Sequence, residues 1–191
     1  MIVLGVDPGT AATGYGVVSG DGGDGGAGAR LLECGVIRTD AAMDLPSRLQ
    51  VIFDGISEVI ERHGAEFLAV ESVFYARNVR TTLVLGHTRG VILLAAQQHN
   101  VKVFEYPPAV IKKAVTGTGA ATKQQVQFMV GTLLRLKTPP QPSDAADGVA
   151  AALAHLQSAP LLSLLGSPPS QDASAEPRGK RNSTGSDRVA R

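Results

Sequence analysis

The hydrophobic pattern of this chain changes its period part of the way along, and that change limits the folds available to it. The N-terminal part holds three short apolar runs separated by turn or glycine-rich residues, at residues 2–7, 14–19 and 30–38. Three such runs in succession predict an antiparallel meander of strands. From residue 45 onward, helical stripes alternate with short apolar runs. A meander followed by alternating helices and strands predicts a mixed α/β sheet with helices on its faces.

The second part of the chain supplies the expected helices and two more strands. Apolar residues three and four apart over residues 45–60 predict an amphipathic helix. Runs at 67–70 and 101–106 predict strands, the first followed by Glu71 and the second by two prolines. Further helices are expected over residues 81–99, 126–136 and 144–156. The glycines of residues 117–119 are expected to form a plain turn between helices, rather than a phosphate-binding loop.

Composition excludes several classes of protein. The 191 residues are 43% hydrophobic, which is enough for one sizeable core. The net charge is +1, so any nucleic-acid site must be a local patch rather than a global excess of positive charge. The single cysteine, Cys34, excludes an intramolecular disulfide framework and fits a reducing compartment. No N-terminal targeting signal or long apolar stretch is visible, so we expect a cytoplasmic protein.

The composition changes sharply after Leu165. Residues 166–191 are rich in Gly, Ser, Pro and Asp, and Val189 is their only large apolar residue. Such a segment cannot bury enough surface to offset the entropy of ordering it, so we expect a disordered polar tail. We therefore expect one domain over residues 1–165. The tail has five basic and three acidic residues, and a weak nucleic-acid tether is an alternative to a plain solvated end.

Four carboxylates stand out by their positions. Asp7 and Glu71 each follow a buried apolar strand, and such strand ends border the crevice where α/β proteins place ligands. Asp144 and Asp147 are three apart, so a helix puts both on one face. The alternatives are that Asp7 forms a turn, that Glu71 caps a helix or lies at the surface, and that Asp144 and Asp147 only complement the positive N-terminal end of a helix. The last alternative explains Asp147 less well, because the apolar residues 148–153 follow it.

Together the four acids are able to form a site of hard oxygen ligands. Such sites prefer Mg²⁺ or Mn²⁺, and two ions held close together suit in-line attack on a phosphodiester. Repulsion among the carboxylates is expected to raise the pKa of at least one of them in the metal-free protein. The four histidines lack the spacing of a zinc site and are expected to be ordinary surface or hydrogen-bonded side chains.

A series of short motifs links these acids to a known family. In chain order they are IVLGVDPGT at 2–10, TGYGVV at 13–18, LPSRL at 45–49, ESVF at 71–74, LGHTRG at 85–90, VFEY at 103–106, KQQVQ at 123–127 and DAAD at 144–147. In this order, and over about residues 1–155, the chain resembles the RuvC family of bacterial Holliday-junction resolvases. Ser72 departs from the glutamine expected after the first glutamate.

The resemblance implies a ribonuclease-H-like fold, with a mixed five-stranded sheet (an antiparallel meander, then parallel strands) and helices on both faces. It implies that Asp7, Glu71, Asp144 and Asp147 are the catalytic, metal-binding acids, with two Mg²⁺ ions per active site and Mn²⁺ able to substitute. The implied reaction is metal-dependent nicking of two opposed strands of a Holliday junction in recombination and repair, leaving 5′-phosphate ends.

The resemblance also implies partners for the chain. Symmetric nicking needs two active sites and hence a C2 homodimer, for which the apolar helix over residues 81–99 is the candidate seam. A core position for that helix is the alternative. The remaining implied partners are four-way junction DNA and a junction-migrating RuvA–RuvB helicase complex.

Five residues are carried over as DNA contacts. The resemblance implies that Phe74 stacks on a base at the opened crossover, a core position being the alternative. Arg77 and Arg80 follow it in what we expect to be a polar loop. Lys112 and Lys123 match basic positions of the family, and phosphate contact is expected for each of these four basic side chains.

Two functions of other classes remain open at this point. Residues 7–10 resemble the first phosphate loop of actin-like ATPases and sugar kinases, so a fragment of such an enzyme is one alternative. Those proteins need a second glycine-rich loop and a second lobe, for which the chain has no room. The other alternative is a non-catalytic junction-binding protein, in which all four acids are incidental.

Overall fold

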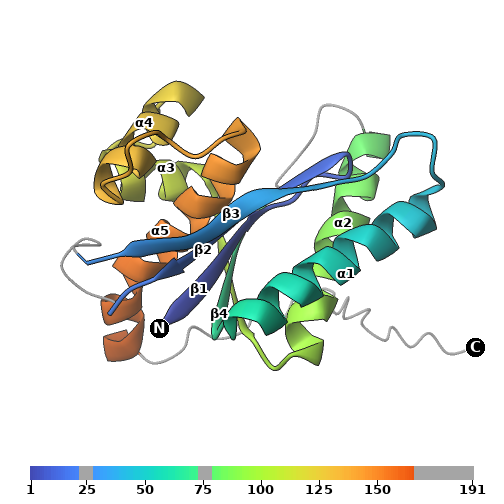
Figure 1. Ribbon diagram of the computed structural model, residues 1–191, viewed down its shortest axis with the longest axis horizontal. Helices are drawn as coiled ribbons and strands as arrows, with labels where there is room; N and C mark the ends of the chain where they lie inside the picture. The colour runs from blue at the N-terminus through green and yellow to red at the C-terminus, as the bar shows by residue number, and fades with distance from the viewer. Residues whose placement is uncertain (22–27, 73–78, 166–191) are drawn as a thin grey trace, which may run out of the picture.

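A computed structural model of the chain describes residues 1–21, 28–72 and 79–165. Its centre is a five-stranded sheet in the order β3-β2-β1-β4-β5 (Figure 1). The strands are β1 (Ile2–Asp7), β2 (Ala12–Ser19), β3 (Arg30–Arg38), β4 (Phe67–Glu71) and β5 (Lys102–Tyr106). The first three form an antiparallel meander, and β4 and β5 run parallel to β1. The expected mixed sheet is confirmed.

Within the described residues, five helices cover the two faces of the sheet (Figure 1). They are α1 (Leu45–His63), α2 (Val79–Gln98), α3 (Pro108–Thr116), α4 (Lys123–Leu133) and α5 (Ser143–Leu165). Successive side chains of a strand point to opposite faces, so Val3 joins one core and Leu4 the other. The core that contains Leu4 is shared with α1 and α2, and the core that contains Val3 is shared with α3, α4 and α5.

Local signals set the bounds of the helices, and several of these bounds differ from the sequence prediction. Helix α3 was missed because Pro107 and Pro108 indicated only the end of a strand, whereas Pro108 occupies the first turn of a helix, where proline is favourable. Gly117, with φ 81°, caps the end of α3. Helix α4 begins at Lys123 rather than at residue 126, because a Thr122–Gln125 capping box starts it there. Helix α5 continues nine residues beyond its predicted end at residue 156.

Close backbone packing brings the start of α5 onto β1 and β2. A Cβ atom on Gly14 of β2 would overlap the backbone carbonyl of Asp144, and one on Gly148 of α5 would lie 2.6 Å from Cα of Tyr15. Only glycine allows helix and strand to approach so closely. These two glycines therefore place the first turns of α5 directly beside the end of β1, where Asp7 lies.

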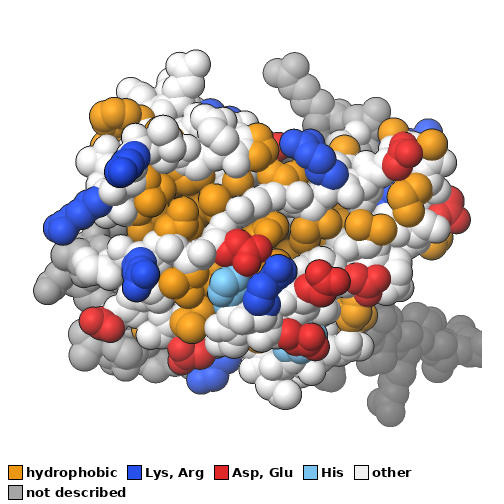
Figure 2. Space-filling model, viewed as in Figure 1, with side chains coloured by type: hydrophobic (Ala, Val, Ile, Leu, Met, Phe, Trp, Pro, Cys, Tyr) orange, Lys and Arg blue, Asp and Glu red, His pale blue; other side chains and the backbone are white. Residues whose placement is uncertain are grey.

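The molecular surface agrees with the near-zero net charge. On the face shown in Figure 2, acidic and basic side chains are interspersed among those drawn in colour, together with stretches of apolar surface. Within the described ranges, no helix has the length and apolar character needed to cross a lipid bilayer. Phe74, Arg77 and the expected tail, residues 166–191, lie outside the described residues.

Candidate metal centre

Three of the four predicted acids meet at one end of the sheet. Asp7 is the last residue of β1, and Asp144 and Asp147 lie in the first turns of α5. One carboxylate oxygen from each of these three residues lies within 4.8 Å of the other two. All three side chains are partly or largely buried, and the cluster results from the close contact of α5 with β1 and β2.

Glu71 lies beside this cluster but does not belong to the 4.8 Å group. It ends β4, which pairs in parallel with β1 so that Val6 is opposite Val70. Asp7 and Glu71 therefore follow neighbouring positions at the same edge of the sheet. The charge of Glu71 acts on Asp7, and that of Asp147 acts on Glu71, so all four acids share one electrostatic environment.

Lys123 bridges two of the acids. As the first residue of α4, it places Nζ 2.6 Å from Oδ2 of Asp147 and 3.1 Å from Oδ1 of Asp144. Partial burial lowers the pKa of Lys123, but the hydrogen bonds to Asp147 and Asp144 outweigh that effect and raise it overall. The sequence analysis predicted a phosphate contact for Lys123. It did not predict the ion pairs of Lys123 with Asp144 and Asp147, because no pattern in the sequence indicates them.

Burial is the main reason that the acids resist ionisation. Loss of solvent raises the pKa of Asp7 to about 7, and the charges of Glu71 and Asp147 add to the rise. Burial likewise raises the pKa of Asp147 and of Glu71. The expected rise in pKa is confirmed, but we had attributed it to repulsion between carboxylates, which ranks below desolvation at Asp7.

The donor set fits a hard divalent cation. Its three clustered ligand atoms are all carboxylate oxygens, the type preferred by Mg²⁺ and Mn²⁺. Their spread, within 4.8 Å, is about twice a metal–oxygen bond length of roughly 2.1 Å, so one ion can reach all three. The charges of Glu71, Asp147 and Asp144 add to the effect of burial on the pKa of Asp7, and the positive charge of Lys123 offsets only part of it. A bound cation would supply that charge.

The other residues predicted as DNA contacts differ in how they are placed relative to the four acids. Lys112, in α3, is half-buried, and its positive charge lowers the pKa of both Glu71 and Asp147. The prediction that Arg80 lies in a loop is wrong. Helix α2 begins at Val79, two residues before its predicted start, and includes Arg80 in its first turn. Phe74 and Arg77 lie in the part of the chain that the structure does not describe.

The other polar groups singled out by the sequence lie in structural positions. His155 is buried, and its Nδ1 lies 2.8 Å from the Tyr106 hydroxyl. His63 Nε2 lies 2.6 Å from a carboxylate oxygen of Glu33. The hydroxyl of Ser72, next to Glu71, is buried without a hydrogen-bond partner among the described residues.

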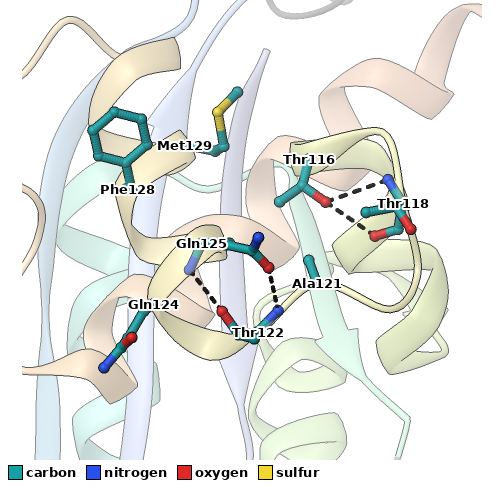
Figure 3. A pocket seen from close by; sticks show the side chains of 8 residues that line it. All are labelled: Thr116, Thr118, Ala121, Thr122, Gln124, Gln125, Phe128 and Met129. Carbon is teal, nitrogen blue, oxygen red and sulfur yellow. Dashed lines mark hydrogen bonds between the residues drawn. The ribbon is translucent and has the colours of Figure 1, made fainter.

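A pocket of about 570 Å³ lies at the turn between α3 and α4 (Figure 3). Its lining residues are Thr116, Thr118, Ala121, Thr122, Gln124, Gln125, Phe128 and Met129. None of the four acids lines it. The hydroxyls of Thr116 and Thr122 are occupied in local turn and cap hydrogen bonds (Figure 3). The pocket is therefore separate from the acidic cluster.

Comparisons with known proteins agree on one family. Residues 3–155 match the family model described as crossover junction endodeoxyribonuclease RuvC. The chain is similar to the crossover junction endodeoxyribonuclease RuvC of Pelotomaculum thermopropionicum, at 48% identity over 81% of this chain and 92% of that protein.

Solved structures lead to the same family. The Thermus thermophilus RuvC structure is 37% identical, with a TM-score of 0.77 over 84% of this chain and 96% of the other. The same coverage holds for the T. thermophilus RuvC in complex with Holliday junction substrate, at 34% identity and a TM-score of 0.75.

Proposed function

The chain belongs to the RuvC family of crossover junction endodeoxyribonucleases, and from this premise we propose that it cuts Holliday junctions at the carboxylate centre of Asp7, Glu71, Asp144 and Asp147. Family membership favours the nuclease over the actin-like ATPase and the non-catalytic binding protein. The observation that carries the assignment of the centre is the approach of three carboxylates to within 4.8 Å, from a strand end and a helix start far apart in sequence.

The proposed chemistry is hydrolysis of a phosphodiester bond. Asp7, Asp144 and Asp147 would hold a divalent cation, with Glu71 completing the acidic surroundings. When bound, Mg²⁺ or Mn²⁺ polarises a phosphoryl oxygen and lowers the pKa of the attacking water. Two ions per site belong to the proposal, because a pair of ions can stabilise both the attacking and the leaving oxygen.

The protein's own groups prepare the centre for this reaction. Lys123 holds Asp144 and Asp147 side by side through its two hydrogen bonds. Asp7, whose pKa is about 7, must lose its proton from the carboxyl group before it can act as a ligand. Protons and metal ions therefore compete for Asp7, and the affinity of the centre for a metal ion should rise with pH.

We propose that Lys112, Lys123 and Arg80 contact phosphates of the junction. Lys112 already lies in the electrostatic field of Glu71 and Asp147, so a phosphate at the acids would also be near this lysine. The remaining two assignments, base stacking by Phe74 and phosphate contact by Arg77, rest on the family resemblance.

A homodimer through α2 is part of the proposal. Helix α2 exposes Val79, Leu83 and Leu94, whose side chains are 76%, 60% and 50% exposed. Leu94 also borders an apolar groove between α1 and α2. Two copies joined there would carry the two active sites that symmetric nicking needs.

Family membership extends the proposal to a RuvA–RuvB complex as partner and to the cytoplasm as the site of action, where bacterial DNA is found. One domain over residues 1–165 also stays a proposal, and its limit coincides with the end of α5.

The direct test incubates the protein with a synthetic four-way junction or a linear duplex, each with and without Mg²⁺. We expect paired nicks with 5′-phosphate ends on the junction only, and only with the metal. Asp7→Asn should lose nicking, whereas Asp54→Asn should keep it. Asp54 is a suitable control because it is exposed on α1 and bonded only to Gln50 among the described contacts. Equal nicking of the duplex, or nicking by Asp7→Asn at the parent rate, would overturn the proposal.

A further inference from the structure

The loop that follows Asp7 is held in place by hydroxyl groups from outside it. The Thr13 hydroxyl, in the fully buried side chain at the start of β2, donates to the carbonyl of Gly9 at 2.7 Å. The hydroxyl of Thr39, just after β3, donates to the carbonyl of Thr10 at 2.6 Å. These bonds fix the backbone of the loop that connects Asp7 to β2.

A third anchor comes from α2. The hydroxyl of Thr88 lies 2.9 Å from that of Thr10, across 78 positions of the sequence. Thr88 is 0% exposed, and with Thr13 and His155 it makes up the buried polar residues of the described ranges. A buried hydroxyl costs free energy unless it is hydrogen-bonded, so this contact is worth more than one at the surface.

Counting protons gives the possible directions of the hydrogen bond. The Thr88 hydroxyl also lies 3.2 Å from the carbonyl of Val84 in its own helix, to which it donates. A hydroxyl has one proton to donate and accepts with its lone pairs. When Thr88 donates to Val84 it accepts from Thr10, and either hydroxyl is able to donate across the pair. In both arrangements the Thr10 side chain is oriented by α2.

This contact joins two parts of the proposed centre. The loop with Thr10 begins directly after Asp7, and α2 is the helix that comes after Glu71 along the chain. Thr10 is three residues from Asp7, so a movement of α2 against β1 would be transmitted to the backbone beside that carboxylate. Small displacements of this kind matter, because metal ligands must be held within a few tenths of an ångström.

We infer that Thr88 is a positioning residue, which acts through Thr10 to hold the Asp7 carboxylate beside Asp144 and Asp147. The inference rests on the proposed metal centre. A positioning role of Thr88 differs from a purely structural role in one measurable way. If the hydroxyl pair only stabilises the fold, its loss lowers the melting temperature and leaves the affinity for divalent ions unchanged.

The test compares two substitutions at the same position. Thr88→Val keeps the size of the side chain and removes the hydroxyl, whereas Thr88→Ser keeps the hydroxyl. Thr132→Val on α4 is the control for losing a hydroxyl that donates within its own helix, here to the carbonyl of Phe128 at 3.1 Å. Unlike Thr88, Thr132 is exposed, and no described hydrogen bond joins its hydroxyl to the loop after Asp7. The first readout needs no DNA. It is the dissociation constant for Mg²⁺, and separately for Ca²⁺, obtained from the rise in melting temperature across a series of metal concentrations.

We expect Thr88→Val to raise that dissociation constant about five- to tenfold, which corresponds to about 1–1.4 kcal/mol, the size of one hydrogen bond. The kcat for junction nicking should fall while KM for the junction changes little. Thr88→Ser and Thr132→Val should behave as the parent. Thr10→Val should reproduce the effect, and the double variant should add nothing to either single one, because both remove the same hydrogen bond.

Several outcomes would overturn the inference. One is an unchanged metal dissociation constant in Thr88→Val together with a lower melting temperature, and another is failure of Thr88→Ser to restore metal affinity. If Thr88→Val does not fold, Thr10→Val at the half-buried end of the pair decides the question. If no divalent ion stabilises the parent, the inference falls with the metal centre. If the parent binds metal but does not cut junctions, only the proposed function falls.

Discussion

Replacing Asp7 with Asn should stabilise the metal-free protein, by an amount that grows with pH. The ordinary pKa of this group is 3.8, and burial followed by the charges of Glu71 and Asp147 raises it to about 7 in the folded chain. At 1.36 kcal/mol per pH unit, this difference means that ionised Asp7 costs the folded state up to about 4 kcal/mol. Asparagine occupies the same space and carries no charge.

The sign of the pH dependence follows from the protons bound in each state. Below pH 3.8 the carboxyl group is protonated in both states and Asp7 has no effect on stability. Between 3.8 and about 7, the folded protein keeps a proton that the unfolded chain has lost, so stability falls as the pH rises. Above 7 the full cost is present. The gain from Asp7→Asn should therefore be about 1.5 kcal/mol at pH 5 and about 4 kcal/mol at pH 8.

The assay is urea unfolding of both proteins with a chelator present, at pH 5 and pH 8. Asp54→Asn, which neutralises an exposed acid on α1, is the control and should change the unfolding free energy by less than about 0.5 kcal/mol at either pH. An equal gain at the two pH values, or a loss of stability at pH 8, would refute the argument that buried charge dominates this centre. In the same variant, junction binding should be at least as strong as in the parent, because a negative charge near the phosphates has been removed.

Four further predictions concern other parts of the molecule. Asp147→Asn should reduce the Mg²⁺-induced rise in melting temperature, and an equal rise in variant and parent would place Asp147 outside the metal site. Gly148→Ala should destabilise the fold by about 1–3 kcal/mol in urea unfolding, because the new Cβ atom would lie 2.6 Å from a backbone atom of β2. Gly90→Ala on α2 is the control and should be tolerated, because its Cβ atom would meet nothing within 4 Å. Leu94→Glu should convert a dimer to a monomer in analytical ultracentrifugation without lowering the melting temperature of the subunit by more than a few degrees, because this side chain is half exposed. Truncation after Leu165 should leave the melting temperature and Mg²⁺-dependent nicking unchanged, and loss of the folded protein would contradict the expected tail.

The sequence alone determined the elements whose signals are local and repeated. Short apolar runs and three- to four-residue stripes depend on neighbours along the chain, so the five strands and helix α1 could be predicted from them. The order of the motifs was sufficient to identify the family. Asp7 and Glu71 were found because each directly follows an apolar run, and Asp144 and Asp147 because of their spacing.

Helix bounds were predicted less well where a single residue has two meanings. Pro108 can end a strand or begin a helix, and its φ angle suits both. The choice depends on whether the following residues find a core to pack against. Ile111 and Val115 of α3 do so, beside α5 and the sheet. That partner is not visible in the local pattern.

Only the tertiary structure decided how the acids behave. The pKa of Asp7 depends first on how much solvent the neighbouring elements exclude, and burial is a property of the packed chain rather than of any motif. The bridge from Lys123 to Asp147 and the contact between Thr10 and Thr88 join residues far apart in sequence. Each forms because the packing of the helices on the sheet brings these elements within hydrogen-bond distance, and such distances in space have no counterpart in the linear order of residues.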